Sequence, residues 1–251
     1  MAGLHELDPL TVLRAYAMGV FPMADHRDAQ SVYWVEPKLR GVMPLDGFHL
    51  SRSLRKTIVS GRFRVTADTA FERIIALCAE SASDRPDTWI NGAIERVFTT
   101  LHAQGFAHSV EVWEGEQLVG GLYGLALGRA FFGESMVSRT RDASKVALAW
   151  LVARLRVGGF TLLDCQFITD HLASLGAIEI PRQDYMGLLG AALGAGAGGL
   201  ESGAPEVSGD FTALDRLLPP EESPPDPIDP AATLFAPRSG MVIAQLLGQT
   251  S

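Results

Sequence analysis

The chain has 251 residues, 47% of them apolar, which suits one globular domain or a small domain joined to a larger one. No apolar run reaches the roughly 20 residues that span a bilayer, and residues 1–10 lack the features of a secretory signal, so we expect a cytoplasmic protein that does not enter a membrane. The net charge of −8 argues at first against a nucleic-acid partner. The two cysteines, Cys78 and Cys165, have no metal-like spacing and are expected to be reduced core residues.

Residues 1–65 are expected to form a small N-terminal domain. A helix capped by Asp8 and starting at Pro9 precedes an aromatic, turn-rich stretch, a short strand over 42–45 and a short helix over 50–60. Positive charge gathers at the end of this domain, because residues 47–67 contain five basic side chains and no acid. Such a segment is either a solvated face or a site that attracts phosphates. Its members are Arg52, Arg55, Lys56, Arg62 and Arg64.

Residues 66–190 predict a larger domain in which helices cover a central sheet. Two helices, one over 68–80 with Asp68 as its cap and one capped by Asn91 and closed by Gly105, precede three strands, and helices then alternate with strands. The predicted strands cover 108–113, 117–127, 130–137, 160–165 and 177–180, and the later helices 142–157, 169–175 and a segment from Arg182. This order predicts an α+β protein.

The remaining residues, 191–251, have a different composition. Glycine and alanine dominate at first, residues 219–230 contain six prolines, and from Glu201 onward there are eight acids and two bases. We expect a disordered, acidic, Pro/Gly-rich extension, in which only the apolar residues 234–247 have the composition to dock back on the core.

Glu134 is the first candidate for chemistry, because it lies among apolar residues of a predicted strand. Strict alternation would place it on one face with Phe132 and Met136. A carboxylate there needs a partner or has its pKa raised. Glu134 is therefore either a functional group or one half of a salt bridge to a base that follows it in the chain. Those bases are Arg139, Arg141 and Lys145.

Asp164 and Gln166 are the second candidates, at the C-terminal end of an apolar strand. Open sheets tend to bind ligands at such ends, and alternation turns both side chains away from Cys165. The pair can hold an amine and accept its proton or hydrogen bond. The alternative is a network that ties a loop to the strand.

No phosphate-binding loop, nucleophile elbow or zinc-binding His-Glu-x-x-His motif occurs, and the histidines are scattered. We therefore expect no metal and no cofactor, and a reaction that relies on a substrate that is already activated.

Several motifs in this order resemble leucyl/phenylalanyl-tRNA–protein transferases. They include Phe132-Gly-Glu-Ser-Met136, Leu163-Asp-Cys-Gln166, His171-Leu-Ala-Ser-Leu-Gly-Ala177 and Glu179-Ile-Pro-Arg182. The likeness extends from about Leu7 to Leu189 and includes Ala15-Tyr-Ala-Met-Gly-Val-Phe-Pro22 and Thr88-Trp-Ile90. One departure stands out: this chain reads Phe21-Pro22-Met23 where a familiar member has tryptophan at the third position.

The resemblance implies a fold and a reaction. The larger domain would be an acetyltransferase-like (GNAT) domain. The sequence itself does not set the oligomeric state, and a monomer is the default expectation. The enzyme would move Leu, Phe or Met from its tRNA to proteins that begin with Arg or Lys, which marks them for N-degron degradation. No coenzyme takes part in that reaction.

The resemblance also implies roles for particular residues. Gln166, with Asp164 behind it as the charge that draws the proton away, would engage the acceptor amine, and Glu134 would contact the substrate's amino group. Trp89 would stack near the 3′-terminal adenosine of the tRNA, and the five bases of residues 47–67 would meet acceptor-stem phosphates. The pocket for the apolar aminoacyl side chain would be formed by Leu122, Phe131, Met136, Leu148, Leu151 and Leu163.

Two other functions are compatible with the sequence. An acyl-CoA-dependent N-acetyltransferase would have a glycine-containing loop before the long helix, and Arg139-Thr-Arg-Asp-Ala-Ser-Lys145 has no such glycines. A non-catalytic RNA- or degron-binding adaptor would not need Glu134, Asp164 and Gln166 near one another.

Overall fold

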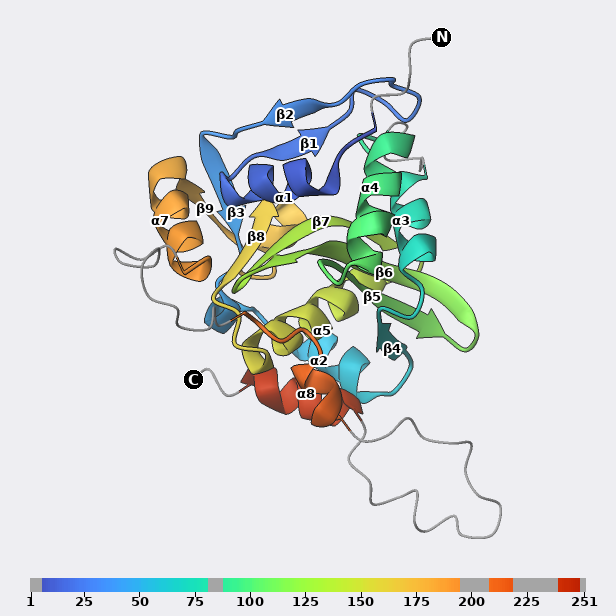
Figure 1. Cartoon of the computed structure of the whole chain (residues 1–251). Helices are drawn as coiled ribbons and strands as arrows, with labels where there is room; N and C mark the ends of the chain where they lie inside the picture. The colour runs from blue at the N-terminus through green and yellow to red at the C-terminus, as the bar shows by residue number, and fades with distance from the viewer. Residues whose placement is uncertain (1–5, 81–87, 195–207, 219–238, 249–251) are drawn as a thin grey trace.

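The computed structural model describes residues 6–80, 88–194, 208–218 and 239–248. It contains a seven-stranded mixed sheet with helices on both faces and a separate two-stranded sheet (Figure 1). The helices are α1 (Pro9–Ala17), α2 (Arg52–Val59), α3 (Phe71–Ala79), α4 (Gly92–Ala103), α5 (Ala143–Val157), α6 (Asp170–Ala173), α7 (Arg182–Ala192) and α8 (Ser239–Gly248), with short 3₁₀ turns η1 (Leu45–Gly47) and η2 (Ala213–Arg216). The strands are β1 (Phe21–Met23), β2 (Tyr33–Val35), β3 (Leu39–Val42), β4 (Arg64–Ala67), β5 (Ala107–Glu114), β6 (Gln117–Leu127), β7 (Ala130–Ser138), β8 (Leu162–Gln166) and β9 (Ile178–Pro181). The α+β class predicted from the sequence is confirmed.

The large sheet has the order β4-β5-β6-β7-β8-β3-β9, and only the β7–β8 pair is parallel. The strand β3 therefore lies between β8 and β9, more than 120 residues away in the chain. A division of the chain at residue 65 stays a prediction, but β3, which precedes that point, contributes its hydrogen bonds to the sheet of the larger unit.

Two apolar clusters, one on each face, hold the helices to the sheet. One cluster contains residues of α2, α5 and α8, and the other contains residues of α1, α3, α4 and α7. Helix α5 is buried along most of its length, as expected of a helix covered on two sides. No helix among the described residues has the length and apolarity to cross a bilayer.

Local signals placed most element ends correctly. The carboxylate of Asp8 accepts from the backbone of Thr11, and Asn91 caps α4 through Ala93 and Ile94. Asp68, expected to cap helix α3, instead has a left-handed backbone (φ 57°), and its carboxylate binds His108 and the backbone N–H of Ser109. The helix therefore starts later, at Phe71.

The described parts of the C-terminal extension are folded onto the core, so the expectation of a disordered extension is wrong for these parts. Docking, which the sequence left open for residues 234–247, is found for helix α8. Helix α8 packs against α2 and α5, as Figure 1 shows, and buries Ile243, Ala244 and Leu247. The buried guanidinium of Arg154 on α5 pairs with Asp215 at 2.6 Å. The proline-rich residues 219–230 lie outside the described residues.

Replacing Ile243 with alanine is expected to lower the free energy of unfolding by about 2–5 kcal/mol, because the fully buried side chain would leave a cavity. Chemical denaturation measures the loss. Met241→Ala, in the same helix but 51% exposed, is the matched control and should change stability little. Equal effects of the two substitutions would mean that α8 does not stay docked in solution.

Candidate active site

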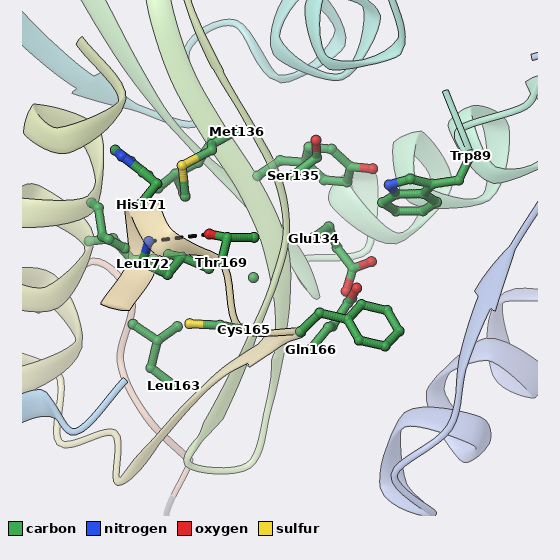
Figure 2. Close-up of a pocket in the computed structure, with 16 residues that line it drawn as sticks. Trp89, Glu134, Ser135, Met136, Leu163, Cys165, Gln166, Thr169, His171 and Leu172 are labelled. Carbon is green, nitrogen blue, oxygen red and sulfur yellow. Dashed lines mark hydrogen bonds between the residues drawn. The ribbon is translucent and has the colours of Figure 1, made fainter. Parts of the chain in front are cut away.

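A cavity opens where strands β7 and β8 separate. The two strands pair only from Ala130 to Phe132 on β7 and from Leu162 to Asp164 on β8. Beyond these pairs, a cavity of about 320 Å³ lies between the strands, lined by residues of both strands, by Leu148 and Leu151 of α5, and by the segment around α6 (Figure 2).

An irregularity in β7 sets the direction of Glu134. Tyr123 of β6 pairs with Ser135, but its neighbour Gly124 pairs with Gly133, so Glu134 is an extra residue in β7. Alternation is reversed at this point. Phe132 packs in the cluster with α1, α3 and α4, whereas Met136 packs against the cluster with α5. The expectation that Glu134 shares one face with both residues is therefore wrong.

One end of the cavity is apolar. Five of the six residues expected around an aminoacyl side chain line it: Leu122, Met136, Leu148, Leu151 and Leu163. Leu172 and Cys165 line it as well. Cys165 is thus only partly buried, which corrects its assignment to the core, whereas Cys78 is fully buried.

The sixth residue, Phe131, does not line the cavity. Its ring is fully buried and stacks on Phe211 of the C-terminal extension, with 5.6 Å between ring centroids. It belongs to the packed part of β7, before the strands separate. Phe131 is therefore a core residue, which corrects its assignment to the pocket.

Glu134 lies at the other, polar end, where its side chain and that of Gln166 meet in Figure 2. Its carboxylate is buried, and neither oxygen has a hydrogen-bond partner. Burial raises its pKa to about 8, although the nearby hydroxyl of Tyr16 and the amide of Gln166 favour the charged form. Tyr16 and Gln166 therefore lie near the carboxyl of Glu134 without an aligned hydrogen bond to it.

The alternative that Glu134 is one half of a salt bridge fails. Arg139 pairs with Glu80, while Arg141 and Lys145 each lie 3.8 Å from the carboxylate of Asp142. Glu134 is therefore a buried acid with unused acceptors that faces a cavity.

Asp164 is fully buried and is bound on several sides. The guanidinium of Arg40, from β3, donates to both carboxylate oxygens, with a shortest distance of 2.6 Å. The hydroxyl of Tyr185, from α7, donates at 2.8 Å, and the backbone N–H of Gln166 at 2.7 Å. The same ion pair raises the pKa of Arg40, despite its burial. As expected from alternation, Asp164 and Cys165 face opposite sides of β8.

Gln166 ends β8 in a strained conformation. Its φ of +61° is unusual for a residue with a side chain, and its bond to Asp164 holds it there. Opposite it in β3 lies Gly41, where a Cβ would stand 2.8 Å from the carbonyl carbon of Phe167. The glycine lets the chain turn closely over β3. As a result Gln166 enters the cavity, where its buried Nε2 has no partner.

The structure thus brings Glu134 and Gln166 together in one cavity, with Asp164 directly behind Gln166. Sequence reasoning missed Arg40, Tyr185 and Tyr16, which surround these groups. Arg40 is 124 residues from Asp164 in the chain, so no spacing rule links them. The only signal was chemical: a carboxylate buried in a strand requires a cation or several donors.

The chain matches two family models. The model described as "Leucyl/phenylalanyl-tRNA protein transferase" covers residues 42–190, and that of its N-terminal domain covers residues 5–38. The chain belongs to this family.

Similar curated proteins support the assignment. A leucyl/phenylalanyl-tRNA–protein transferase of Rhizorhabdus wittichii is 60% identical over 99% of this chain and 100% of its own length. One of Zymomonas mobilis is 59% identical over 86% of this chain and 78% of its own length. This transferase is therefore an enzyme by family, and its cavity is the candidate active site.

Trp89 lies at the polar end of the transferase cavity, on the same side of Figure 2 as Glu134. The end of β1 is joined to it, because the backbone N–H of Ala24 donates to the carbonyl of Trp89 at 3.1 Å. Met23, which departs from the family pattern, therefore directly precedes Ala24, whose backbone is hydrogen-bonded to Trp89. It is partly buried against the core.

The basic residues expected to meet phosphates divide into two groups. Arg52, Arg55 and Lys56 are exposed on α2 and form no ion pair with a described residue. Arg62 pairs with Glu114 at 2.8 Å, and Arg64 lies over the ring of Trp113. Helix α2 belongs to the cluster with α5, whereas Trp89 packs with the cluster on the other face of the sheet. The tRNA-binding role of both groups stays a prediction.

Among the described residues, no group of three or more His, Cys, Asp or Glu side chains is arranged to hold a metal ion.

Proposed function

We propose that this transferase moves Leu, Phe or Met from its tRNA to the α-amine of proteins that begin with Arg or Lys, and so marks them for N-degron degradation. The observation that carries the proposal is the two-ended cavity, with apolar walls at one end and unpartnered Glu134 and Gln166 at the other.

The apolar end suits the aminoacyl side chain. Leucines and the flexible Met136 can adapt to Leu, Phe or Met side chains. Such a pocket rejects a side chain that lacks one methylene by only about 1–3 kcal/mol. We therefore expect several apolar aminoacyl groups to be transferred, at different rates.

The polar end suits the amino group of the same aminoacyl ester. In the empty site at neutral pH, the carboxyl of Glu134 is mostly protonated, because its pKa is about 8. An incoming ammonium supplies the missing positive charge, so Glu134 ionises when the ammonium binds and its proton passes to the solvent. The ion pair between Glu134 and the ammonium then positions the aminoacyl ester at the polar end of the cavity.

The reaction joins the acceptor amine to the ester carbonyl carbon. The new C–N bond forms as the bond to the tRNA's ribose oxygen breaks, and one amine proton ends on that oxygen. The α-ammonium of a protein has a pKa near 8, so freeing its lone pair at neutral pH costs only about 1 kcal/mol. Positioning the two groups therefore supplies most of the catalysis.

Gln166 is the group we assign to hold the acceptor amine. An amide is a weak base, so its part is to orient the amine. Asp164 was expected to draw the proton away. Its bonds to Arg40, Tyr185 and the backbone of Gln166 favour another part, namely holding Gln166 in its strained conformation.

We further propose that Trp89 stacks on the terminal base of the tRNA, while Arg52, Arg55 and Lys56 of α2 bind phosphates. Each phosphate contact releases counterions. Replacing these three bases with glutamine should reduce the salt dependence of tRNA affinity, lowering the slope of log Kd against log salt by about 2–3. Filter binding over a salt series measures the slope. The same slope in the variant and the wild type would place the phosphate contacts elsewhere.

Two structural expectations belong with this proposal. The pairing of β7 with β8 followed by their separation, with α5 between them in the chain, supports a GNAT-like fold for the larger unit. We also propose that the enzyme acts as a monomer in the cytoplasm.

Mass spectrometry of an Arg-starting peptide, incubated with Phe-tRNA and the enzyme, tests the proposed function. The peptide mass should increase by one phenylalanine residue, and acetyl-CoA should give no product. Gln166→Ala should lower the single-turnover rate by about 10–100-fold, because the amine loses an oriented partner. Gln117→Ala, at an exposed position of β6, is the control. An unmodified peptide would contradict the proposed function.

A further inference from the structure

Tyr16 is a buried tyrosine that none of the expected roles uses. It lies on α1 with no exposed surface, and its ring packs edge-on against Phe132 and Phe98, with centroids 5.0 and 6.4 Å away. Its hydroxyl has no hydrogen-bond partner. Since buried hydroxyls in proteins nearly always have a partner, this one requires an explanation.

The hydroxyl lies beside Glu134, because the ring of Tyr16 packs on Phe132, two residues before Glu134 in β7, and the hydroxyl and the carboxyl act on each other. The charge of Glu134 contributes to raising the pKa of Tyr16, after burial, and the hydroxyl in turn favours the charged form of Glu134. Tyr16 does not line the cavity, whereas Glu134 does. The hydroxyl therefore reaches the substrate only through Glu134.

Unused hydrogen-bonding atoms from three elements meet at this point. They are the hydroxyl of Tyr16 on α1, both oxygens of Glu134 on β7 and Nε2 of Gln166 on β8. Two of these groups can donate, and the carboxylate can only accept once it is ionised. The set is thus complementary, although none of these atoms has an aligned hydrogen-bond partner.

Other charged and titratable groups near Glu134 do not replace these donors. Asp164 of β8 and Arg40 of β3 are paired with each other. Tyr123 of β6 contributes less than Glu134 to the raised pKa of Tyr16, and His171, at the apolar end beside Met136 in Figure 2, has its pKa lowered by burial and by Lys145. Within the part of the chain that the structure describes, Tyr16 and Gln166 are therefore the side-chain donors that favour a negative charge on Glu134.

We propose that Tyr16 is a positioning residue: its hydroxyl donates to Glu134 when that carboxylate holds the ammonium of the aminoacyl group. This inference rests on the proposed function. Binding of the ammonium would draw Glu134 into alignment with both donors, so that the aminoacyl group completes this hydrogen-bond network. The small N-terminal unit would thereby contribute directly to recognition of the aminoacyl group.

The pH profile of transfer by Tyr16→Phe tests the inference. Without the hydroxyl, kcat/KM for Phe-tRNA should fall at least tenfold at neutral pH, because a hydrogen bond to a charged group is lost. The acidic limb of the profile should move to higher pH, since ionised Glu134 loses a donor. Affinity for uncharged tRNA should stay unchanged. The thermal midpoint should be equal or higher, because the substitution removes an unpartnered hydroxyl.

Two further variants separate a positioning role from a structural one. Tyr33→Phe makes the same change on an exposed ring of β2 and should leave the profile unmoved. Adding Tyr16→Phe to Glu134→Gln should cause little further loss. An unmoved acidic limb, a lower thermal midpoint or an undiminished loss in the Glu134→Gln background would overturn the inference. If the wild type fails to modify the peptide, the proposed function itself fails, whatever Tyr16 does.

Discussion

Replacing Glu134 with glutamine is expected to lower kcat/KM for aminoacyl-tRNA by about 100–1000-fold, through loss of a charge partner in a site shielded from water. Steady-state transfer to an Arg-starting peptide measures the effect. Glu116→Gln, in the exposed turn between β5 and β6, removes the same charge outside the cavity and should be neutral. If the Glu134→Gln enzyme were as active as the wild type, the charge of Glu134 would have no part in the transfer reaction.

The same substitution should stabilise the protein, and the sign follows from the pKa. The carboxyl of Glu134 has an ordinary pKa of 4.5 and a pKa of about 8 in the folded chain, so the folded state binds its proton more tightly. The contribution of this carboxyl to the free energy of unfolding is fully present below pH 4.5 and is progressively lost as the pH rises to about 8.

The stability gain of Glu134→Gln should therefore grow over this range, to on the order of 3–5 kcal/mol above about pH 8. Denaturation of both proteins at a series of pH values measures the difference. A gain that does not vary with pH would mean that Glu134 ionises normally in the empty enzyme.

Replacing Arg40 with methionine is expected to lower the free energy of unfolding by about 3–5 kcal/mol. The side chain of Arg40 is 1% exposed, and the side chain of its partner Asp164 is 0% exposed. Loss of the cation leaves a buried negative charge with two remaining donors, Tyr185 and the backbone of Gln166. Chemical denaturation at neutral pH measures the loss.

The double variant Arg40→Met with Asp164→Leu should recover most of that stability, because no uncompensated charge remains. The recovered protein should still transfer poorly, since the backbone of Gln166 loses its bond to Asp164. Arg141→Met is the control, because the side chain of Arg141 is 90% exposed. Full activity in the double variant would show that Asp164 does not act by holding Gln166.

Sequence patterns predicted the local elements of this fold well. The strand over 117–127 and the caps at Asp8 and Asn91 depend on neighbouring residues only, and each was found as expected. Alternation failed at Glu134, because the extra residue in β7 reverses the faces without any sign in composition.

Contacts between distant segments could not be predicted in the same way. The insertion of β3 between β8 and β9 places Arg40 beside Asp164, and the docking of η2 and α8 covers α5. Both depend on which apolar faces remain uncovered after the local elements form. Strand position singled out Glu134, Asp164 and Gln166 and the family resemblance supplied their roles, but the partners that determine their charge and direction required the structure.

Binding of Phe-tRNA and N-acetyl-Phe-tRNA to the wild type and to Glu134→Gln tests most directly whether the cavity recognises the aminoacyl ammonium through Glu134. Acetylation removes the positive charge and leaves the phenyl side chain and the tRNA intact. Acetylation is expected to weaken binding to the wild type at least tenfold and to change binding to the variant little. An equal loss in both proteins would show that the ammonium does not meet Glu134.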